Sequence, residues 1–358
     1  MSEENTVDKA EVYKNAKAWR KIVVKYQKPS IAKASWQLIN TFAALAATWV
    51  AMSLAYDYKI WWLLIILMMI GGGLGVRTFI IFHDCGHQSF FKSRKANDFW
   101  GYICGTIVFT PYRFWHWEHK IHHSTTGALD ERAEGDVWTM TVKEYEESTM
   151  PMRMLYRIVR NPFMLFTISP MFLFVIWQRF SVKKAKMKDR LSVWWTNIGL
   201  IFMISAGCYI LGWEKYVILQ LGLSFVSNSA GIWIFYVQHQ FEDVYWARND
   251  KWNFAQAALE GSSFYKLPKI LQWFSGNIGF HHIHHLSSRI PNYRLEECHN
   301  AEPLFQEVPE MTLLSSLACL KHRLHDEENG RLVGFGYLKE YRKAQAAKAA
   351  KAPLKAAA

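Results

Sequence analysis

The chain has 358 residues, a formal net charge of +12 and a hydrophobic fraction of 51%. Its mean hydropathy is nevertheless only -0.06, so we expect long apolar segments separated by basic, polar stretches rather than one soluble core. The five cysteines are scattered and form no Cys-x-x-Cys pair, so neither a disulfide framework nor a cysteine zinc site is indicated. No nucleic-acid-binding motif accompanies the positive charge, which favours anionic lipid or an acidic protein as the partner.

Residues 1–37 form a basic leader. Its start, MSEENTVDKA, is polar and lacks the apolar core of a signal peptide. The cations of the leader are Lys9, Lys14, Lys17, Arg20, Lys21, Lys25, Lys28 and Lys33. Positive charge next to an apolar segment is typical of the cytoplasmic side of a membrane protein.

Two apolar runs follow the leader, at residues 38–56 and 60–82, and each is long enough to cross a hydrocarbon layer of ~30 Å as a helix. Only residues 57–59 separate them, so the sequence predicts a tight transmembrane hairpin. Residues 60–70 are apolar on every side, whereas helices at the surface of soluble proteins carry a polar face. Arg77, near the end of the second run, is expected to reach the membrane surface or a lipid headgroup.

Three groups of histidines share a helical spacing of three or four residues, which places the imidazoles of each group on one face of a helix. They are His83 and His87, then His119 with His122 and His123, and finally His281 with His284 and His285. Three such turns facing one another supply more nitrogen ligands than one ion binds, and neutral imidazole suits iron, zinc and copper. The sequence therefore predicts a binuclear metal site.

Two shorter apolar stretches lie between the histidine groups. Residues 99–111 are too short to span comfortably, and residues 162–178 are near the lower limit and contain Pro162 and Pro170. If only one of them crossed the membrane, a histidine group or a basic segment would lie on the opposite side. We therefore expect both to be interfacial or re-entrant helices.

A second hairpin is predicted from the apolar runs at residues 194–212 and 215–237. Two hairpins return the chain to its starting side, so all three histidine groups would lie on the same side of the membrane. The basic residues before this hairpin are Arg179, Lys183, Lys184, Lys186, Lys188 and Arg190. Together with the leader they predict a protein of the inner cell membrane whose histidines and both termini lie on the cytoplasmic side.

The residues around the histidines identify a family resemblance. The segments are HDCGHQSFF (83–91), PYRFWHWEHKIHH (111–123) and NIGFHHIHHLSSRIPNYRLEECH (277–299). The order His-x3-His, His-x2-His-His, His-x2-His-His around two membrane hairpins resembles the membrane-bound fatty acid desaturases. The similarity is closest to the bacterial acyl-lipid omega-6 (delta-12) or delta-5 desaturases, and it covers residues 38 to about 325.

The resemblance implies an all-α integral membrane protein with four transmembrane helices in two hairpins, interfacial helices and a cytoplasmic histidine-rich cap that holds a di-iron site. The expected parts are the leader 1–37, the membrane domain with its cap at 38–330, and a C-terminal segment 331–358 with an Ala/Lys-rich tail. The tail is expected to be either a frayed helix ending near Pro353 or a disordered basic segment.

The resemblance also implies the ligands of two iron ions. They are His83, His87, His119, His122, His123, His239, His281, His284 and His285. His239, in the segment VQHQFED, stands where the family has one further ligand, and the alternative is an interfacial histidine at a helix end. His116 is expected to belong to an interfacial wall, His282 to face away from the site, and His299, His322 and His325 to lie at the surface.

Ligating imidazoles normally donate their second N–H to a carboxylate or a carbonyl. The candidate carboxylates for this role are Asp84, Glu118, Asp130, Asp136 and Glu242. Aromatic and apolar residues from 60–70 and 223–236 are candidates for the walls of a tunnel that would hold the substrate.

The implied reaction is O2-dependent insertion of a cis double bond into a fatty acyl chain on a membrane lipid, on CoA or on a carrier protein. It consumes two external electrons. The sequence has no flavin or nicotinamide fingerprint and no fused cytochrome with His-Pro-Gly-Gly, which implies a separate ferredoxin or flavodoxin as donor.

Two other functions stay open at this point. A related membrane di-iron oxygenase, such as an alkane hydroxylase or a carotenoid ketolase, would use similar clusters, although the third group of the hydroxylases contains Glu and Tyr. A membrane metal-binding or transport protein would place its ligands within the spans as a conduction path. Here the histidines lie just beyond the spans, which disfavours transport.

Overall fold

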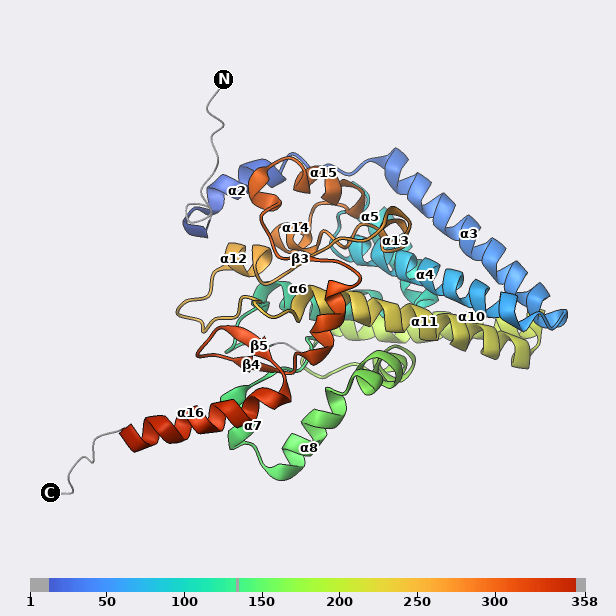
Figure 1. The fold of residues 1–358 in the computed structure, drawn as a ribbon. Coiled ribbons are helices and arrows are strands. Elements are labelled where there is room, and N and C mark those ends of the chain that lie inside the picture. Colours follow the sequence, from blue (N-terminus) through green and yellow to red (C-terminus); the bar gives the residue numbers. More distant parts are fainter. Residues whose placement is uncertain (1–12, 133–134, 352–358) are drawn as a thin grey trace.

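The computed structural model describes residues 13–132 and 135–351, and helices make up most of it (Figure 1). The start of the predicted leader, residues 1–12, and the end of the predicted tail, residues 352–358 with Pro353, lie outside the described residues. The cytoplasmic location of both termini therefore stays a prediction. Long helices form one end of the molecule, and a cap of shorter elements lies at the other end.

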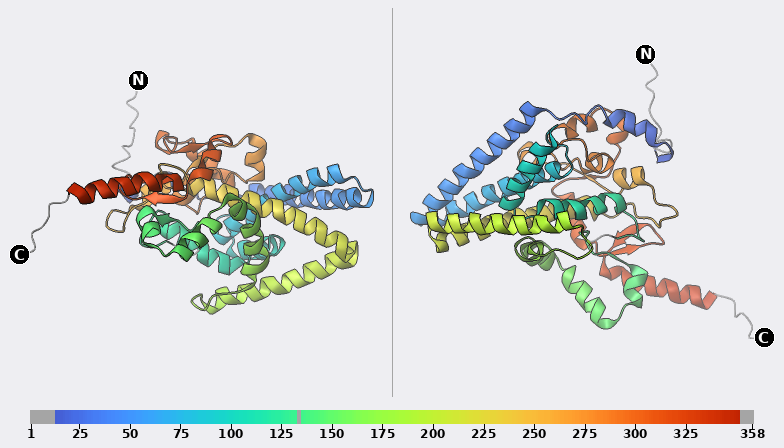
Figure 2. Two further views of the ribbon diagram at one scale, coloured as in Figure 1. Left: turned by 60° about the horizontal axis from the view of Figure 1, so that its bottom comes forward. Right: turned by 180° about the vertical axis from the view of Figure 1, so that it is seen from behind.

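Four helices are long and apolar enough to cross a membrane, which confirms the predicted pair of hairpins. They are α3 (Ile31–Asp57), α4 (Trp61–Gly86), α10 (Met187–Leu211) and α11 (Trp213–His239). The tips of both hairpins lie at the same end of the molecule, on the right in Figure 1 and on the left in the rear view of Figure 2. Each helix extends past its apolar run toward the opposite end, so the histidines of α4 and α11 lie at the cap.

A glycine of α4 lets α11 pack closely against it. A Cβ atom at Gly72 would lie 2.3 Å from Cγ1 of Val226, closer than side-chain atoms can approach. Small residues at such positions bring membrane helices together because the two backbones can come near each other. At the hairpin tips, Nζ of Lys215 lies 2.9 Å from a carboxylate oxygen of Asp57, and this ion pair joins α11 to α3.

Arg77 of α4 does not reach the membrane surface, so that prediction was wrong. Its side chain is only 6% exposed, its Nε donates to Oγ1 of Thr41 at 3.0 Å, and its guanidinium lies 4.1 Å from the ring centroid of Trp273. It also donates to the carbonyl oxygen of Trp273. A charged side chain inside a span is costly unless it has partners, and these partners join α3 and α4 to α13 (Lys269–Phe274).

Short helices connect the two hairpins. They are α5 (Arg94–Ile107), α6 (Tyr112–Thr125), α7 (Val142–Glu147), α8 (Met150–Val159), the π-helical η1 (Met164–Ile168) and η2 (Phe172–Ile176) with α9 (Ser169–Met171) between them, and η3 (Trp177–Arg179). The segment Met164–Arg179 is bent by 58° relative to α8. Such a bend occurs in a broken span or in a re-entrant loop, so the interfacial or re-entrant character of residues 162–178 stays a prediction.

The cap consists mainly of chain that follows α11. Its helices are α12 (Phe254–Leu259), α13, α14 (His281–Leu286), η4 (Asn292–Arg294), α15 (Leu295–His299), η5 (Pro303–Phe305), η6 (Ser315–Lys321), η7 (Phe335–Tyr337) and α16 (Leu338–Lys351). The helix α16 agrees with the helical interpretation of the Ala/Lys-rich segment over the described residues. From the leader, α2 (Ala16–Val23) buries Trp19 and Val23 in the same core as Ile283 of α14.

Two small sheets complete the cap, and neither was predicted. In the first sheet the strand order is β1 (Met140–Thr141), β4 (Leu324–Asp326), β5 (Arg331–Val333), with β1 parallel and β5 antiparallel to β4. In the second sheet β2 (Phe264–Tyr265) pairs in parallel with β3 (Glu310–Met311). The strands have only two or three residues each, too few to produce a visible alternation of apolar and polar residues in the sequence.

Candidate metal centre

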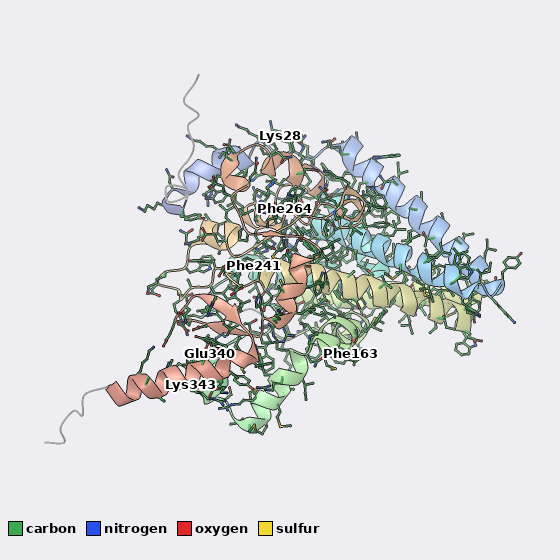
Figure 3. The ribbon with its side chains drawn as sticks, in the orientation of Figure 1. Lys28, Phe163, Phe241, Phe264, Glu340 and Lys343 are labelled. Carbon is green, nitrogen blue, oxygen red and sulfur yellow. The ribbon has the colours of Figure 1, made fainter. Side chains whose placement is uncertain are left out.

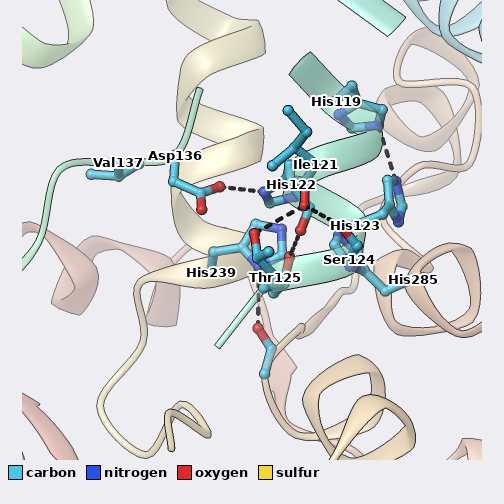
Figure 4. Close-up of polar contacts among 12 residues, drawn as sticks. His119, Ile121, His122, His123, Ser124, Thr125, Asp136, Val137, His239 and His285 are labelled. Atoms are coloured by element: carbon cyan, nitrogen blue, oxygen red, sulfur yellow. Dashed lines mark hydrogen bonds and ion pairs between the residues drawn. The ribbon is translucent and has the colours of Figure 1, made fainter. Parts of the chain in front are cut away.

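The structure brings all nine predicted histidines together at the boundary between the long helices and the cap. Their nitrogen atoms form two groups, and within each group the candidate ligand atoms lie within 4.8 Å of one another. The first group is His83, His87, His119, His123 and His284. The second group is His122, His239, His281 and His285. Figure 4 shows His122, His123, His239 and His285 with their imidazoles gathered in one place.

The two groups are intertwined because α6 and α14 each contribute to both. On α6, His119 and His123 are four residues apart and share the first group, whereas His122 belongs to the second. On α14 the assignment is reversed, since His281 and His285 share the second group and His284 belongs to the first. Residues four apart lie on the same side of a helix, so two helical turns facing each other create two adjacent cages.

Close contacts between imidazole nitrogens fit a metal site. The Nε2 atoms of His123 and His284 lie 2.9 Å apart, and those of His239 and His281 lie 2.8 Å apart. The Nε2 atoms of His87 and His122 are buried and have no hydrogen-bond partner among the described residues. Buried nitrogen atoms without partners are costly, and a metal ion would satisfy them.

The chemistry of the donor set narrows the choice of metal. All candidate ligands are imidazoles, which suit iron, zinc and copper. The first group offers five imidazoles, one more than the tetrahedral coordination of a structural zinc ion uses. Two adjacent groups of imidazoles fit a pair of metal ions.

Contacts at Nδ1, the ring nitrogen that would not bind a metal, fix the orientation of three imidazoles. Nδ1 of His83 lies 3.1 Å from Oδ1 of Asp84, and Nδ1 of His239 lies 3.1 Å from the carbonyl oxygen of Gly261. Nδ1 of His122 contacts Oδ1 of Asp136, as Figure 4 shows. Contacts of this kind leave Nε2 of each ring free for a metal, so Asp84 and Asp136 have the predicted role.

Asp84 also links the first histidine group to the chain that follows α14. Its Oδ2 accepts hydrogen bonds from the backbone N–H of Asn292 at 2.6 Å and from Nδ2 of the same residue at 2.9 Å. No spacing signal in the sequence pointed to Asn292 or to the Gly261 carbonyl, because both contacts depend on how distant segments pack.

Burial keeps the imidazoles outside the spans neutral. It lowers the pKa of six of them well below the usual value, and neighbouring imidazoles add to the effect because two cations would repel each other. These residues are His87, His119, His123, His281, His284 and His285. A neutral imidazole is the form that binds a metal ion.

A cavity of about 440 Å³ adjoins the two groups. Its lining includes His83, His119, His122 and His281, and apolar residues such as Phe79, Phe174 and Phe235 form much of the remaining wall. A second, mainly apolar cavity of about 470 Å³ continues among the long helices and shares Val108, Ser227 and Asn228 with the first.

The chain matches the family described as fatty acid desaturase over residues 59–313, which is more than half of its length. The chain belongs to the fatty acid desaturase family. It is therefore an oxidoreductase with a histidine-rich candidate metal site at the end of its membrane helices.

Three relatives illustrate the similarity of the desaturase to other proteins. It is 42% identical over 319 residues to a fatty acid desaturase of Bacillus subtilis, with 89% of this chain and 90% of the relative covered. It is 26% identical to an sn-1 oleoyl-lipid 12-desaturase of Synechocystis, with 86% and 88% covered. It is 27% identical to an sn-1 acyl-lipid omega-3 desaturase (ferredoxin) of Nostoc sp., with 66% of each chain covered.

Several predictions about the surroundings of the site in this desaturase were wrong. Asp130 pairs with Arg248 at 2.6 Å and Glu242 with Arg331 at 3.8 Å, so neither carboxylate contacts an imidazole of the site. Glu118 lines the first cavity, and its predicted contact with an imidazole stays a prediction. The two side chains that pair with arginines lie on loops, where the sequence does not reveal their direction.

The predicted cavity walls were only partly right. Residues 223–236 of α11 line both cavities, as predicted. Residues 60–70 line neither, and α4 contributes Val76, Phe79 and Ile80 instead. The difference arises because much of the first half of α4 faces outward, as the 67% exposure of Trp62 shows.

The histidines outside the two groups are more buried than predicted. His282 faces away from the site, as predicted, with Nε2 lying 3.1 Å from Nδ1 of His299 and 3.0 Å from the carbonyl oxygen of Phe305. His299, His322 and His325 were predicted at the surface, but all three are buried. The cap folds over them because their segments pack against one another, which single-residue polarity does not reveal. Trp115 stacks on His119 with ring centroids 4.3 Å apart, and the interfacial position expected for His116 stays a prediction.

Proposed function

We propose that this desaturase uses O2 and a pair of iron ions to insert a cis double bond into an acyl chain of a membrane lipid. The observation that carries the proposal is that histidines of two adjacent imidazole groups line a cavity whose other walls are largely apolar. The nine histidines of the two groups would hold the iron ions. When bound, the iron pair supplies the redox chemistry with O2.

The overall reaction balances as follows. Two neighbouring methylenes each lose one hydrogen, and a carbon–carbon double bond forms between them. The substrate supplies two electrons, an external carrier supplies two more, and O2 takes up all four with the necessary protons to give two molecules of water.

The residues around the cavity have a positioning role in this proposal. Phe79, Phe174 and Phe235 would hold the alkyl chain by apolar contact so that two methylenes lie next to the imidazole groups. Correct placement of a reacting group removes much of the entropic part of the barrier. The same walls exclude water from the reacting carbons.

The substrate and the electron donor are proposed partly by analogy. Two relatives carry acyl-lipid or oleoyl-lipid in their names, which supports a lipid-bound acyl chain. One of these names also includes ferredoxin, which supports a ferredoxin or a flavodoxin as the donor for this chain.

The proposed orientation places the imidazole groups in the cytoplasm with both termini. The support is the positive charge of residues 13–37 and 179–190 at the end of the long helices that bears the histidines. Cysteine labelling in intact cells would test this orientation, and an externally labelled residue in the cap would contradict it.

Expression in a host without polyunsaturated lipids tests the proposed activity. We expect a new double bond in the lipid acyl chains, located by gas chromatography and mass spectrometry of derivatised lipids, together with iron in the purified active protein. A hydroxylated or ketone product would favour a related oxygenase. Altered metal tolerance without any lipid change would favour the metal-transport alternative.

A further inference from the structure

A third hollow lies between α11 and Met164–Arg179, which we call the bent segment. This outer groove has a volume of about 560 Å³, and every residue of its wall except Thr167 is apolar. The wall consists of Phe163, Thr167, Ile168, Met171, Phe172, Val175, Ile176 and Phe225. Figure 3 labels Phe163, just before the bent segment, where the chain leaves α8 and reaches the long helices. A groove of this composition favours a hydrocarbon ligand over a polar one.

The outer groove lies at the depth of the lipid hydrocarbon. Phe225 stands near the middle of α11 (Trp213–His239), which is a candidate span. Since the hydrocarbon layer is ~30 Å thick, the middle of a spanning helix is far from both membrane surfaces. Phe172, Ile176 and Phe225 are also exposed. At that depth the alkyl chains of membrane lipids surround them, so an alkyl chain is the ligand that the groove can take up.

The outer groove and the first cavity lie on the two sides of the bent segment. Phe172 and Ile176 line the groove, whereas their neighbours in the chain, Leu173 and Trp177, line the first cavity. The wall between the two spaces is therefore a single helix, whose diameter with side chains is about 10 Å.

A weak contact joins the centre of the bent segment to α11. Nδ2 of Asn228 lies 3.7 Å from Sδ of Met171, and a thioether sulfur is a weak hydrogen-bond acceptor. Met171 lines the groove, while Asn228 lines both inner cavities. Because a methionine side chain has three rotatable bonds, this contact can open at small cost and connect the groove with the cavities.

Both ends of the bent segment are held more firmly than its centre. The ring of Phe166 packs edge-to-face on Trp233 with centroids 5.1 Å apart, and Arg179 donates to Oδ1 of Asn197 at 3.0 Å. Between these ends lie two π-helical turns with Pro170 between them. Proline removes a backbone hydrogen bond, and π-helical turns are rare and occur frequently at functional sites. The centre can therefore bend away from α11 while both ends stay in place.

We propose that the outer groove binds the acyl chain of a membrane lipid first, and that the chain then passes sideways into the first cavity when the centre of the bent segment moves. The inference rests on the proposed function, which places such a chain in that cavity. A route through water would cost ~0.8 kcal/mol for each methylene exposed. The sideways route keeps the chain in apolar surroundings throughout.

Blocking the groove with a removable group tests the proposal. Ile168→Cys places a thiol in the groove at a position that is 47% exposed. A methanethiosulfonate reagent that carries pyrene would fill the groove through a disulfide. The protein is assayed in discs of phosphatidylglycerol with palmitoyl and oleoyl chains, with reduced ferredoxin and O2. We expect the steady rate of double-bond formation to fall at least about tenfold, because entry becomes the slow step. Removal of the pyrene with dithiothreitol should restore the rate.

The matched control is Ile198→Cys on α10. Ile198 is 54% exposed and lies outside the outer groove and both inner cavities. Wild-type protein treated with the same reagent gives the contribution of Cys208, which is partly exposed. The labelled control should keep its rate. An equal loss in the labelled control, or no loss in labelled Ile168→Cys, would overturn the entry route.

The order of addition separates entry from chemistry. Ile168→Cys is first held without O2 in the lipid discs so that a chain fills the cavity, and the groove is then blocked. When O2 is added, the first round should proceed at the unblocked rate and later rounds should be slow. A block that also slowed the first round would act on the fold or the chemistry, and the entry route would be wrong.

Two further outcomes separate the remaining alternatives. If labelling of Ile168→Cys dissociated an oligomer in light scattering and left the rate unchanged, the groove would be a contact between copies of the chain, and the entry route would be wrong. If unlabelled, iron-loaded wild-type protein formed no double bond, the proposed function itself would fail.

Discussion

Neighbouring histidines of α14 face in opposite directions. Nε2 of His284 lies 2.9 Å from Nε2 of His123, inside the first imidazole group. Nε2 of His282 lies 3.0 Å from the carbonyl oxygen of Phe305, within the cap. One helical turn therefore serves the candidate metal site and the protein core with the same kind of side chain, and the two roles can be separated by mutation.

We expect His284→Ala to abolish product and to weaken iron binding by at least ~100-fold. Even the loss of a residue that only hydrogen-bonds to a metal ligand lowers metal affinity by about 10–100-fold. His282→Ala is the matched variant, and it should retain iron while losing ~1–3 kcal/mol of stability through an unpaired buried carbonyl. Iron analysis and lipid profiling of both proteins check this. Product formation by the His284 variant would contradict the proposed ligand set.

Two aspartates that follow α6 provide a second comparison. Asp136→Asn is expected to weaken iron binding ~10–100-fold, because it removes the carboxylate that orients the ring of His122. Asp130→Asn changes a carboxylate that pairs with Arg248 instead, and it should leave iron binding unaltered. Competition with a chelator measures both affinities. Equal affinities in the two variants would show that Asp136 does not orient the ring.

At the scale of secondary-structure elements, the contact between α4 and α11 determines how the ends of these helices are placed. Those ends carry His83 and His239, one for each imidazole group. Close packing at Gly72 fixes the distance between the two helices, so a change there is expected to affect stability first.

Gly72→Ala should destabilise the protein by ~1–3 kcal/mol, because the new methyl group would overlap Cγ1 of Val226. Val226→Ala in the same chain should restore much of the loss by removing the overlapping atoms. The control is Gly231→Ala on the same helix as Val226, where a Cβ atom would have no neighbour within 4 Å. Thermal unfolding in detergent measures the stability of all three variants. If Gly72→Ala were as stable as the wild-type protein, the packing argument would be refuted.

At the scale of the whole molecule, the neutral state of the buried imidazoles connects metal retention to pH. Burial lowers the pKa of six of these histidines, whereas in the unfolded chain each would have a pKa of about 6.5. The unfolded state therefore binds more protons at acidic pH. The contribution to stability is fully present above pH ~6.5 and is lost progressively as the pH falls below it.

We accordingly expect iron to be released when the purified protein is moved from pH ~8 to ~5, because protonated imidazoles cannot bind metal. Dialysis at graded pH followed by metal analysis measures the release. Full retention of iron at the lower pH would contradict neutral imidazoles as the ligands.

Much of this architecture could be predicted from the sequence because its signals are local. Apolar runs of sufficient length predicted both hairpins, and one-turn spacing predicted three histidine faces. The assignment of His122 and His284 to groups separate from their helical neighbours depends on how α6 faces α14, which no single segment encodes. The burial of His325 and the partner of Asp130 likewise depend on loops that pack across long separations in the chain.

Because α6 and α14 each supply imidazoles to both cages, the two halves of the centre share their walls. Withdrawing an ion from either cage would free imidazoles on both helices and loosen the other cage as well. Half-filled molecules should therefore be rare. Sub-stoichiometric iron would then divide the population into molecules with both ions and molecules with none. Spectra recorded during such a titration would be mixtures of those two species alone.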